Sequence, residues 1–418
     1  MLKDIIVDSG KYFIGMAIVA LVELIKTPLI ASYYGPGIFG DYAIVYGAVF
    51  LIVMFSISWI SATIVRFIPE YEKKNVAGFV ENYVMIFAIK SIVFMTIVWF
   101  VVIYSLKSFF TPGFFSILLA GGPFSATLAM DRLFLSVLRA QRRPNKYLIY
   151  SIAQGFGGLI LGVVFISMIK TGVEGFIWGQ IIITLVFMPI FWFKYIKTSM
   201  NIKLLLNQKN KEFNLKLISY GLPVLGINIL TWVMSTSDRF LIKLFTGNEA
   251  VGIYSAIYNI SEKSIFLISY TLTMGFVPII FRLWENEGEK AVKPMMRKIV
   301  KLYLLIAIPV SLAIILLGKS ITEILFSKAY LPGYTAMPYI VIGALFIGLA
   351  NVYTEVFTIK KETKKLLLCY LIAAATNVGL NLFFIPQYGY MGAAYSTLFG
   401  YIVFFLITYF YSRKLMIF

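Results

Sequence analysis

Charged side chains interrupt several long apolar stretches of this sequence. A charge costs several kcal/mol in hydrocarbon, so each one needs an opposite charge or a water-filled cavity. Cations in such places can bind a phosphate or another anionic group, and carboxylates can tune them or carry a coupling proton or sodium ion. The cations are Lys26, Lys90, Arg132, Arg239 and Lys263. The carboxylates are Glu23, Asp131, Asp238, Glu262 and Glu355.

The simplest explanation for any one of these charges is a structural ion pair without a role in function. Glu23 and Lys26 lie three residues apart, so they share a helix face. Lys90 has no acidic neighbour in its own apolar stretch, which favours a ligand contact there. Five cations against five carboxylates leave the sign of a central cavity open.

The composition places most of the chain in a bilayer. The chain has 418 residues, of which 60% are hydrophobic and only 13% charged. A soluble domain of this length could not cover its surface with so few polar side chains. Histidine is absent and there is a single cysteine, which excludes histidine-based metal sites, catalytic triads and intramolecular disulfides. We therefore expect no metal site, no catalytic residues and no bound cofactor.

Twelve segments are apolar and long enough to cross the hydrocarbon layer, which takes about 20 residues. Only helices satisfy their own backbone in lipid, and nothing in the sequence has the alternation of a barrel. We expect an all-α polytopic membrane protein. The segments are 12–34, 42–65, 80–104, 114–138, 147–169, 175–194, 219–245, 251–280, 300–318, 336–359, 366–386 and 391–412.

Basic residues crowd into every second gap between these segments. Of the 37 lysines and arginines, 27 fall at the two ends of the chain or in the basic stretches 66–74, 139–146, 194–216, 282–301 and 360–365. Positive loops stay in the cytoplasm, so both termini are expected there. The net charge of +18 then belongs to loops facing anionic lipid, and nucleic acid is not an expected partner.

An internal repeat underlies this pattern. The stretch Gly35–Tyr42 recurs at Gly247–Tyr254, with two glycines five apart and a tyrosine two further on. A fainter match relates 172–175 to 389–392. Six spans return a chain to its starting side, so the two halves run in the same direction. We expect two parallel six-helix halves, 1–196 and 214–418, around a central cavity, joined by a cytoplasmic linker at 197–213.

Four short motifs accompany this topology: 27–42, 237–240 with 252–255, Leu138-Arg139-Ala140 with Arg142, and Ile385-Pro386 with Gly389 and Gly392. Together with the topology, they resemble the multidrug/oligosaccharidyl-lipid/polysaccharide exporter superfamily. The resemblance covers essentially the whole chain and is greatest for the Wzx-type polysaccharide flippases.

The resemblance implies a flippase that moves undecaprenyl-diphosphate-linked O-antigen or capsule units across the bacterial inner membrane by alternating access. Its expected partners are the lipid-linked oligosaccharide, membrane lipid, a polysaccharide polymerase and a chain-length regulator. The coupling ion, a proton or sodium, stays open.

Two other functions compete with the flippase. A cation-coupled multidrug exporter of the same superfamily would have a cavity dominated by carboxylates and aromatic rings, and the five intramembrane cations argue against it. A membrane enzyme, such as a polysaccharide polymerase or lipid-linked glycosyltransferase, would present a large outer loop with carboxylates. The longest outer gap, 318–335, has Glu323 as its only acidic residue, so we expect no enzyme.

Overall fold

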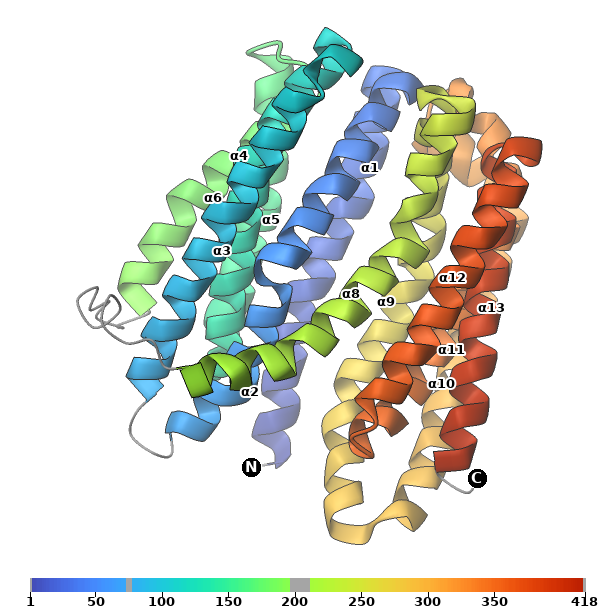
Figure 1. Ribbon diagram of the computed structural model, residues 1–418. Coiled ribbons are helices and arrows are strands. Elements are labelled where there is room, and N and C mark those ends of the chain that lie inside the picture. Colours follow the sequence, from blue (N-terminus) through green and yellow to red (C-terminus); the bar gives the residue numbers. More distant parts are fainter. Residues whose placement is uncertain (1, 73–76, 196–210, 416–418) are drawn as a thin grey trace. The chain divides into compact units, whose positions relative to one another are not determined.

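The computed structural model describes residues 2–72, 77–195 and 211–415, and these ranges are helical apart from short turns (Figure 1). The all-α expectation is therefore confirmed for the described part. In chain order the elements are α1 (Leu2–Val53), η1 (Met54–Ser58), α2 (Trp59–Glu72), α3 (Ala77–Ser105), η2 (Lys107–Phe109), α4 (Pro112–Ala140), α5 (Pro144–Ser167), α6 (Glu174–Tyr195), α8 (Lys211–Thr246), α9 (Asn248–Glu287), α10 (Glu289–Leu325), η3 (Lys328–Ala336), α11 (Met337–Ile359), α12 (Thr363–Tyr388) and α13 (Tyr390–Leu415).

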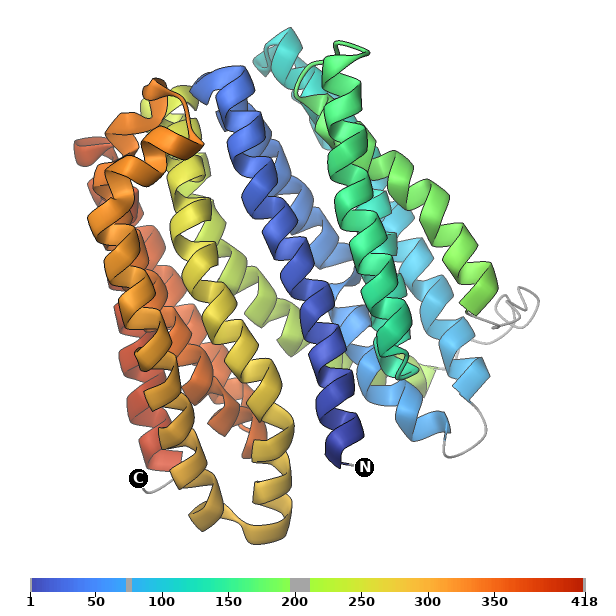
Figure 2. The ribbon, with the colours of Figure 1, turned by 180° about the vertical axis from the view of Figure 1, so that it is seen from behind.

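Eleven helical runs of the described residues are long and apolar enough to cross a membrane. The first, Gly10–Phe67, has 58 residues and is broken at Gly35, where φ is 75° and ψ is 173°. Figure 2 shows the N-terminal arm of α1 running to this turn. Each arm exceeds the roughly 20 residues that a span needs. Counted with these two arms taken separately, the described residues contain twelve helical segments long enough to cross a membrane, in agreement with the expectation.

Equivalent turns in the two sequence halves have the same backbone conformation. Gly247, which precedes α9, has φ 91° and ψ 177°, close to the values at Gly35. The turns after α4 and α11 match as well, because Arg142 and Lys361 both have left-handed backbone, with φ of 52° and 58°. This correspondence supports the internal repeat.

The later glycines of the repeated motif bring α1 and α9 into backbone contact. A Cβ on Gly40 would overlap the carbonyl oxygen of Asn248, and a Cβ on Gly252 would overlap that of Pro36. Beside this crossing, Lys243 donates to Asp41 at 2.9 Å. Glycine is therefore required at both positions by close approach. The glycines at 158, 162 and 179 serve the same purpose between α5 and α6, where a Cβ on Gly179 would lie 2.9 Å from the Gly162 Cα.

By packing, the chain forms two compact units. The amino-terminal unit comprises residues 14–22 and 45–229, and the carboxy-terminal unit comprises 1–13, 23–44 and 230–418. Residues 23–44 of the first predicted half therefore pack with helices of the second. Most of the predicted linker at 197–213 lies outside the described residues, and the division at that linker stays a prediction.

We predict that Gly40→Ala destabilises the protein and that Gly37→Ala does not. The new methyl group at position 40 meets backbone, which cannot move aside, whereas a Cβ on Gly37 meets nothing within 4 Å. Overpacking of this kind costs about 1–3 kcal/mol. Thermal unfolding of the detergent-solubilised variants measures the difference. Equal unfolding midpoints for the two variants would contradict the backbone crossing.

Candidate functional site

The ten charged residues predicted from the sequence fall into both compact units. Six of them gather in the carboxy-terminal unit on α1, α8 and α9: Glu23, Lys26, Asp238, Arg239, Glu262 and Lys263. Glu355 belongs to the same unit but lies on α11, near Tyr370 of α12. The amino-terminal unit holds the remaining three, Lys90 on α3 and Asp131 and Arg132 on α4.

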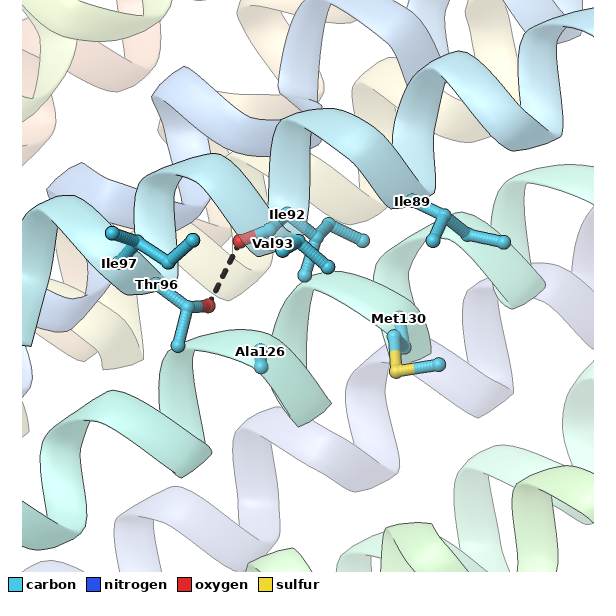
Figure 3. A pocket seen from close by; sticks show the side chains of 7 residues that line it. All are labelled: Ile89, Ile92, Val93, Thr96, Ile97, Ala126 and Met130. Carbon is cyan, nitrogen blue, oxygen red and sulfur yellow. Dashed lines mark hydrogen bonds between the residues drawn. The ribbon is translucent and has the colours of Figure 1, made fainter. Parts of the chain in front are cut away.

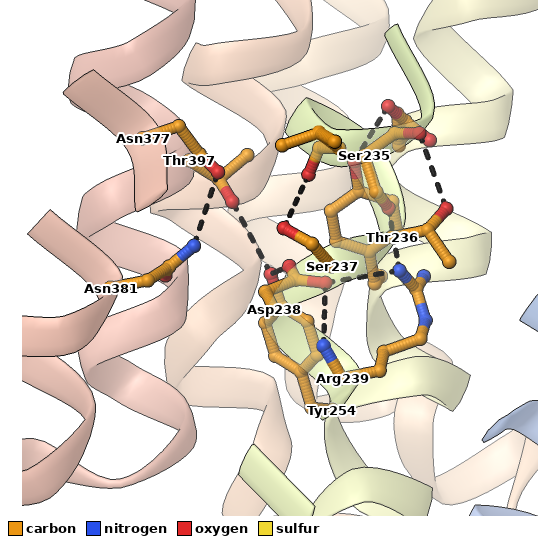
Figure 4. Close-up of polar contacts among 12 residues, drawn as sticks. Ser235, Thr236, Ser237, Asp238, Arg239, Tyr254, Asn377, Asn381 and Thr397 are labelled. Carbon is orange, nitrogen blue, oxygen red and sulfur yellow. Dashed lines mark hydrogen bonds and ion pairs between the residues drawn. The ribbon is translucent and has the colours of Figure 1, made fainter. Parts of the chain in front are cut away.

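Asp238 and Arg239 form a buried ion pair within α8 (Figure 4). The Arg239 Nη1 lies 3.2 Å from the Asp238 Oδ1 and also donates to the Ser235 carbonyl. Asp238 is 1% exposed and Arg239 6%. The sequence repeat placed both residues inside a span, and the structure confirms this because α8 continues to Thr246.

Two tyrosines of α9 contact this pair. The Tyr254 hydroxyl donates to the Asp238 Oδ2 at 2.5 Å. The Arg239 guanidinium lies over the Tyr258 ring, 4.5 Å from its centroid, which is a favourable cation–π geometry. Each charge of the pair therefore has an aromatic neighbour as well as its ionic partner.

Glu262 accepts two tyrosine hydroxyls at one carboxylate oxygen. Tyr258 donates to its Oε1 at 2.7 Å and Tyr401 at 2.9 Å, and the two hydroxyls lie 2.9 Å apart. Our sequence analysis missed these rings. A signal was present, since Tyr254, Tyr258 and Glu262 recur every four residues and so share one face of α9.

Glu23 and Lys26 form an ion pair on α1, as their spacing predicted. The Tyr42 hydroxyl adjoins Lys26. Lys263 lies within electrostatic reach of both members of this pair and of Arg239 and Glu262. The six clustered residues carry three positive and three negative formal charges, so the cluster is balanced. Balance of this kind is what allows charges to remain in a low-dielectric environment.

Two asparagines of α12 lie beside this cluster with unused hydrogen-bonding groups. The Asn381 Nδ2 donates to the Asn377 Oδ1 at 3.1 Å, whereas the Asn377 Nδ2 and the Asn381 Oδ1 have no partner. Both side chains are 0% exposed. Figure 4 shows them with Thr397 on one side of Asp238, and the Thr397 Oγ1 is 3.4 Å from the Tyr254 hydroxyl. The sequence analysis did not single out these residues.

The amino-terminal unit presents a different arrangement. Lys90 and Arg132 are both exposed, and no carboxylate forms an ion pair with either one in the described ranges. Arg132 makes a cation–π contact with Phe50 at 5.9 Å. Asp131 is buried against Tyr150, and its Oδ1 lacks a hydrogen-bond partner. The Lys90 side chain is therefore accessible to a ligand, as the predicted contact requires.

Within the part of the chain that the structure describes, no three His, Cys, Asp or Glu side chains cluster as metal ligands would. The charged residues of the carboxy-terminal cluster contact one another and the neighbouring tyrosines. Long apolar helices with a balanced set of charges buried among them are typical of a multi-pass membrane protein with a functional polar site.

Comparison with known proteins places this chain in a family. The chain belongs to the polysaccharide biosynthesis protein family, whose model matches residues 8–284. The MatE family model matches residues 223–383. The fold and these matches together identify a transporter of the MOP superfamily, in agreement with the resemblance seen in the sequence.

Solved structures share this fold over nearly the whole chain. An inward-facing multidrug resistance MATE family transporter of the MOP superfamily has a TM-score of 0.76 at 13% identity, covering 96% of this chain and 97% of that one. A MOP superfamily transporter from Pyrococcus furiosus has a TM-score of 0.73 at 15% identity, with coverages of 99% and 95%. The lipid II flippase MurJ, in an inward closed conformation, has a TM-score of 0.76 at 15% identity, with coverages of 96% and 87%.

A curated relative is similar over part of its length. The uncharacterized membrane protein MJ1068 of Methanocaldococcus jannaschii is 27% identical over 204 residues, which is 48% of this chain and 39% of that protein. The chain thus matches about two fifths of the length of this relative.

We predict that Arg239→Leu strongly destabilises the protein. The substitution leaves the Asp238 carboxylate buried without its cation, and removing one member of a buried pair costs about 3–5 kcal/mol. The double variant Asp238→Asn/Arg239→Leu removes both charges and should recover most of the loss. Thermal unfolding in detergent measures all three proteins. A double variant no more stable than Arg239→Leu alone would contradict the pairing.

Proposed function

We propose that this chain flips undecaprenyl-diphosphate-linked oligosaccharides from the cytoplasmic to the outer leaflet of the bacterial inner membrane by alternating access. The oligosaccharides would be O-antigen or capsule repeat units, so that the chain serves lipopolysaccharide or capsule synthesis. Membership of the polysaccharide biosynthesis protein family supports this proposal. In this proposal the protein acts as a transporter and breaks no covalent bond of its substrate.

The availability of cations inside the spans carries the proposal. Such a flippase moves a diphosphate and several sugars through hydrocarbon, so it must offer positive charge at membrane depth. Lys90 and Arg132 are exposed and have no carboxylate paired with them in the described ranges. They are suited to a diphosphate. Lys26, Arg239 and Lys263 belong to the balanced cluster, where their hydrogens and the neighbouring tyrosines can bind sugar hydroxyls.

A cation-coupled multidrug exporter is the second candidate, favoured by the MatE match. An exporter of organic cations needs carboxylates that the drug can reach. The carboxylates of Glu23, Asp238 and Glu262 already accept hydrogen bonds from lysine, arginine or tyrosine side chains. Asp131 and Glu355 are the carboxylates that would have to serve such an exporter. Resistance of a deletion strain to cationic drugs separates the two functions.

We assign ion coupling to the surroundings of Asp238. The Tyr254 hydroxyl lies between its Oδ2 and Thr397, the two asparagines of α12 lie on the same side (Figure 4), and the Asn381 Oδ1 is an unused acceptor. A sodium ion would displace the Tyr254 hydroxyl from the carboxylate and use these neutral oxygens as further ligands, and a proton on the carboxylate could take its place. Both termini would lie in the cytoplasm by the charge rule, and a polysaccharide polymerase and a chain-length regulator would act on the flipped product.

We predict that Lys90→Glu and Arg132→Glu each abolish flipping, because a carboxylate repels the diphosphate. The measurement is transfer of a fluorescent undecaprenyl-diphosphate oligosaccharide across proteoliposomes, together with surface polysaccharide in a deletion strain. Lys319→Glu is the matched control, since Lys319 is an exposed lysine paired with Glu323 at the end of α10. Flipping at the wild-type rate by both Lys90→Glu and Arg132→Glu would refute the proposed role of these cations.

We predict further that sodium raises the thermal unfolding midpoint of the wild-type protein more than potassium does, because an ion that binds only the folded state stabilises it. Thr397→Val and Asn381→Leu should each remove that difference. Thr408→Val is a control, since the Thr408 hydroxyl donates to the carbonyl of Phe404 on its own helix. A sodium effect that survives in both site variants would contradict this location. Absence of the effect in wild type, with flipping driven by a pH gradient, would indicate a proton.

A further inference from the structure

An apolar groove lies between α3 and α4 of the amino-terminal unit (Figure 3). Its volume is about 240 Å³. The one hydroxyl in its wall, that of Thr96, donates to the Ile92 carbonyl at 2.8 Å and so is already satisfied. The groove therefore offers a ligand only hydrocarbon contacts. Its lining residues are Ile89, Ile92, Val93, Thr96, Ile97, Ala126 and Met130.

Lys90 lies next to one end of the groove. Ile89 and Met130 mark that end in Figure 3, with Ile97 at the other. Lys90 follows Ile89 on α3, whereas Arg132 of α4 contacts Phe50 of α1 and does not line the groove. Val93 and Ile97, three and seven residues after Lys90, are 52% and 56% exposed. Lys90 thus shares a helix face with the open edge of the groove.

Lys90 places a positive charge in the apolar part of α3. It lies six residues after Val84, the first residue of the candidate span, or about 9 Å along the helix. An apolar groove beside a cation complements a lipid that joins an anionic group to a long hydrocarbon chain. A polyprenyl diphosphate has this combination, and an ordinary phospholipid is the alternative that the experiment must distinguish.

From this juxtaposition we infer a binding site for the junction between the diphosphate and the polyprenyl chain of the substrate. The diphosphate contacts Lys90, and the isoprene units nearest to it occupy the groove between α3 and α4. This assignment rests on the proposed flippase function and adds to it a fixed place for the lipid tail. Branched hydrocarbon packs well against the Ile, Val and Met side chains of the wall.

Photo-crosslinking tests the site directly. The probe is a polyprenyl diphosphate without sugars that carries a diazirine in the isoprene unit next to the diphosphate, added to wild-type protein in nanodiscs. We expect mass spectrometry to find the label on Ile89–Ile97 and Ala126–Met130. Excess unlabelled polyprenyl diphosphate should compete with it, and excess polyprenol should not. A diazirine phospholipid that labels the same residues to the same extent would show annular lipid only and would overturn the inference.

Two variants separate the charge from the groove. Lys90→Gln should raise the half-saturating probe concentration about tenfold, because the variant loses one hydrogen bond to a charged group. Ala126→Phe should fill the groove and remove the labelling. Ile160→Phe is the matched control, since Ile160 is an exposed apolar residue of α5 that does not line the groove. Unchanged labelling in both Lys90→Gln and Ala126→Phe would refute the site.

The same preparation distinguishes this inference from the function on which it rests. Flipping of the lipid-linked oligosaccharide without labelling of the groove would overturn the tail site and leave the flippase intact. Labelling of the groove that depends on Lys90, in a protein that does not flip the oligosaccharide, would support the lipid site and overturn the flippase.

Discussion

A charge inside a bilayer must find its counter-charge within the protein, and this constraint organises the structure. Hydrocarbon offers neither water nor counter-ions, so a buried ionic group is stabilised when another side chain pairs with it. In the carboxy-terminal unit, Asp238 with Arg239 and Glu23 with Lys26 meet this requirement as neighbours on one helix. Tyr254 then donates to the second oxygen of Asp238, and Tyr258 and Tyr401 both donate to one oxygen of Glu262. The outcome is a compact polar cluster with no net formal charge.

The two units meet the constraint in different ways. The carboxy-terminal unit neutralises the six charges of its cluster internally and keeps unused amide groups beside Asp238. The amino-terminal unit leaves Lys90 and Arg132 exposed, and Lys90 lies next to the end of an apolar groove. A balanced cluster suits the coupling of an ion to a change in shape, because adding or removing one charge there alters the stability of the whole cluster. Exposed cations beside hydrocarbon suit an anionic lipid. The proposed function uses both arrangements.

Much of this was readable in the sequence, and for identifiable reasons. The spans followed from length and hydrophobicity, because the bilayer imposes both. The repeat predicted equivalent turns, and Gly35 and Gly247 have nearly the same backbone angles. The Glu23–Lys26 pair followed from helical spacing alone. The tyrosines on α9 were not predicted as part of the site, because the chain has 27 tyrosines, although their spacing of four residues places them on one helix face.

By itself the sequence determined the helical class, the number of crossings, the repeat and the charges that needed an explanation. These depend on local properties: hydrophobicity, helical period and the conformational demands of glycine. Only the tertiary structure decided which charges are neutralised and which stay available. Tyr401 reaches Glu262 across 139 positions of sequence, and the groove needs side chains from two helices. Such contacts depend on how helices distant in sequence pack together, which no local pattern records.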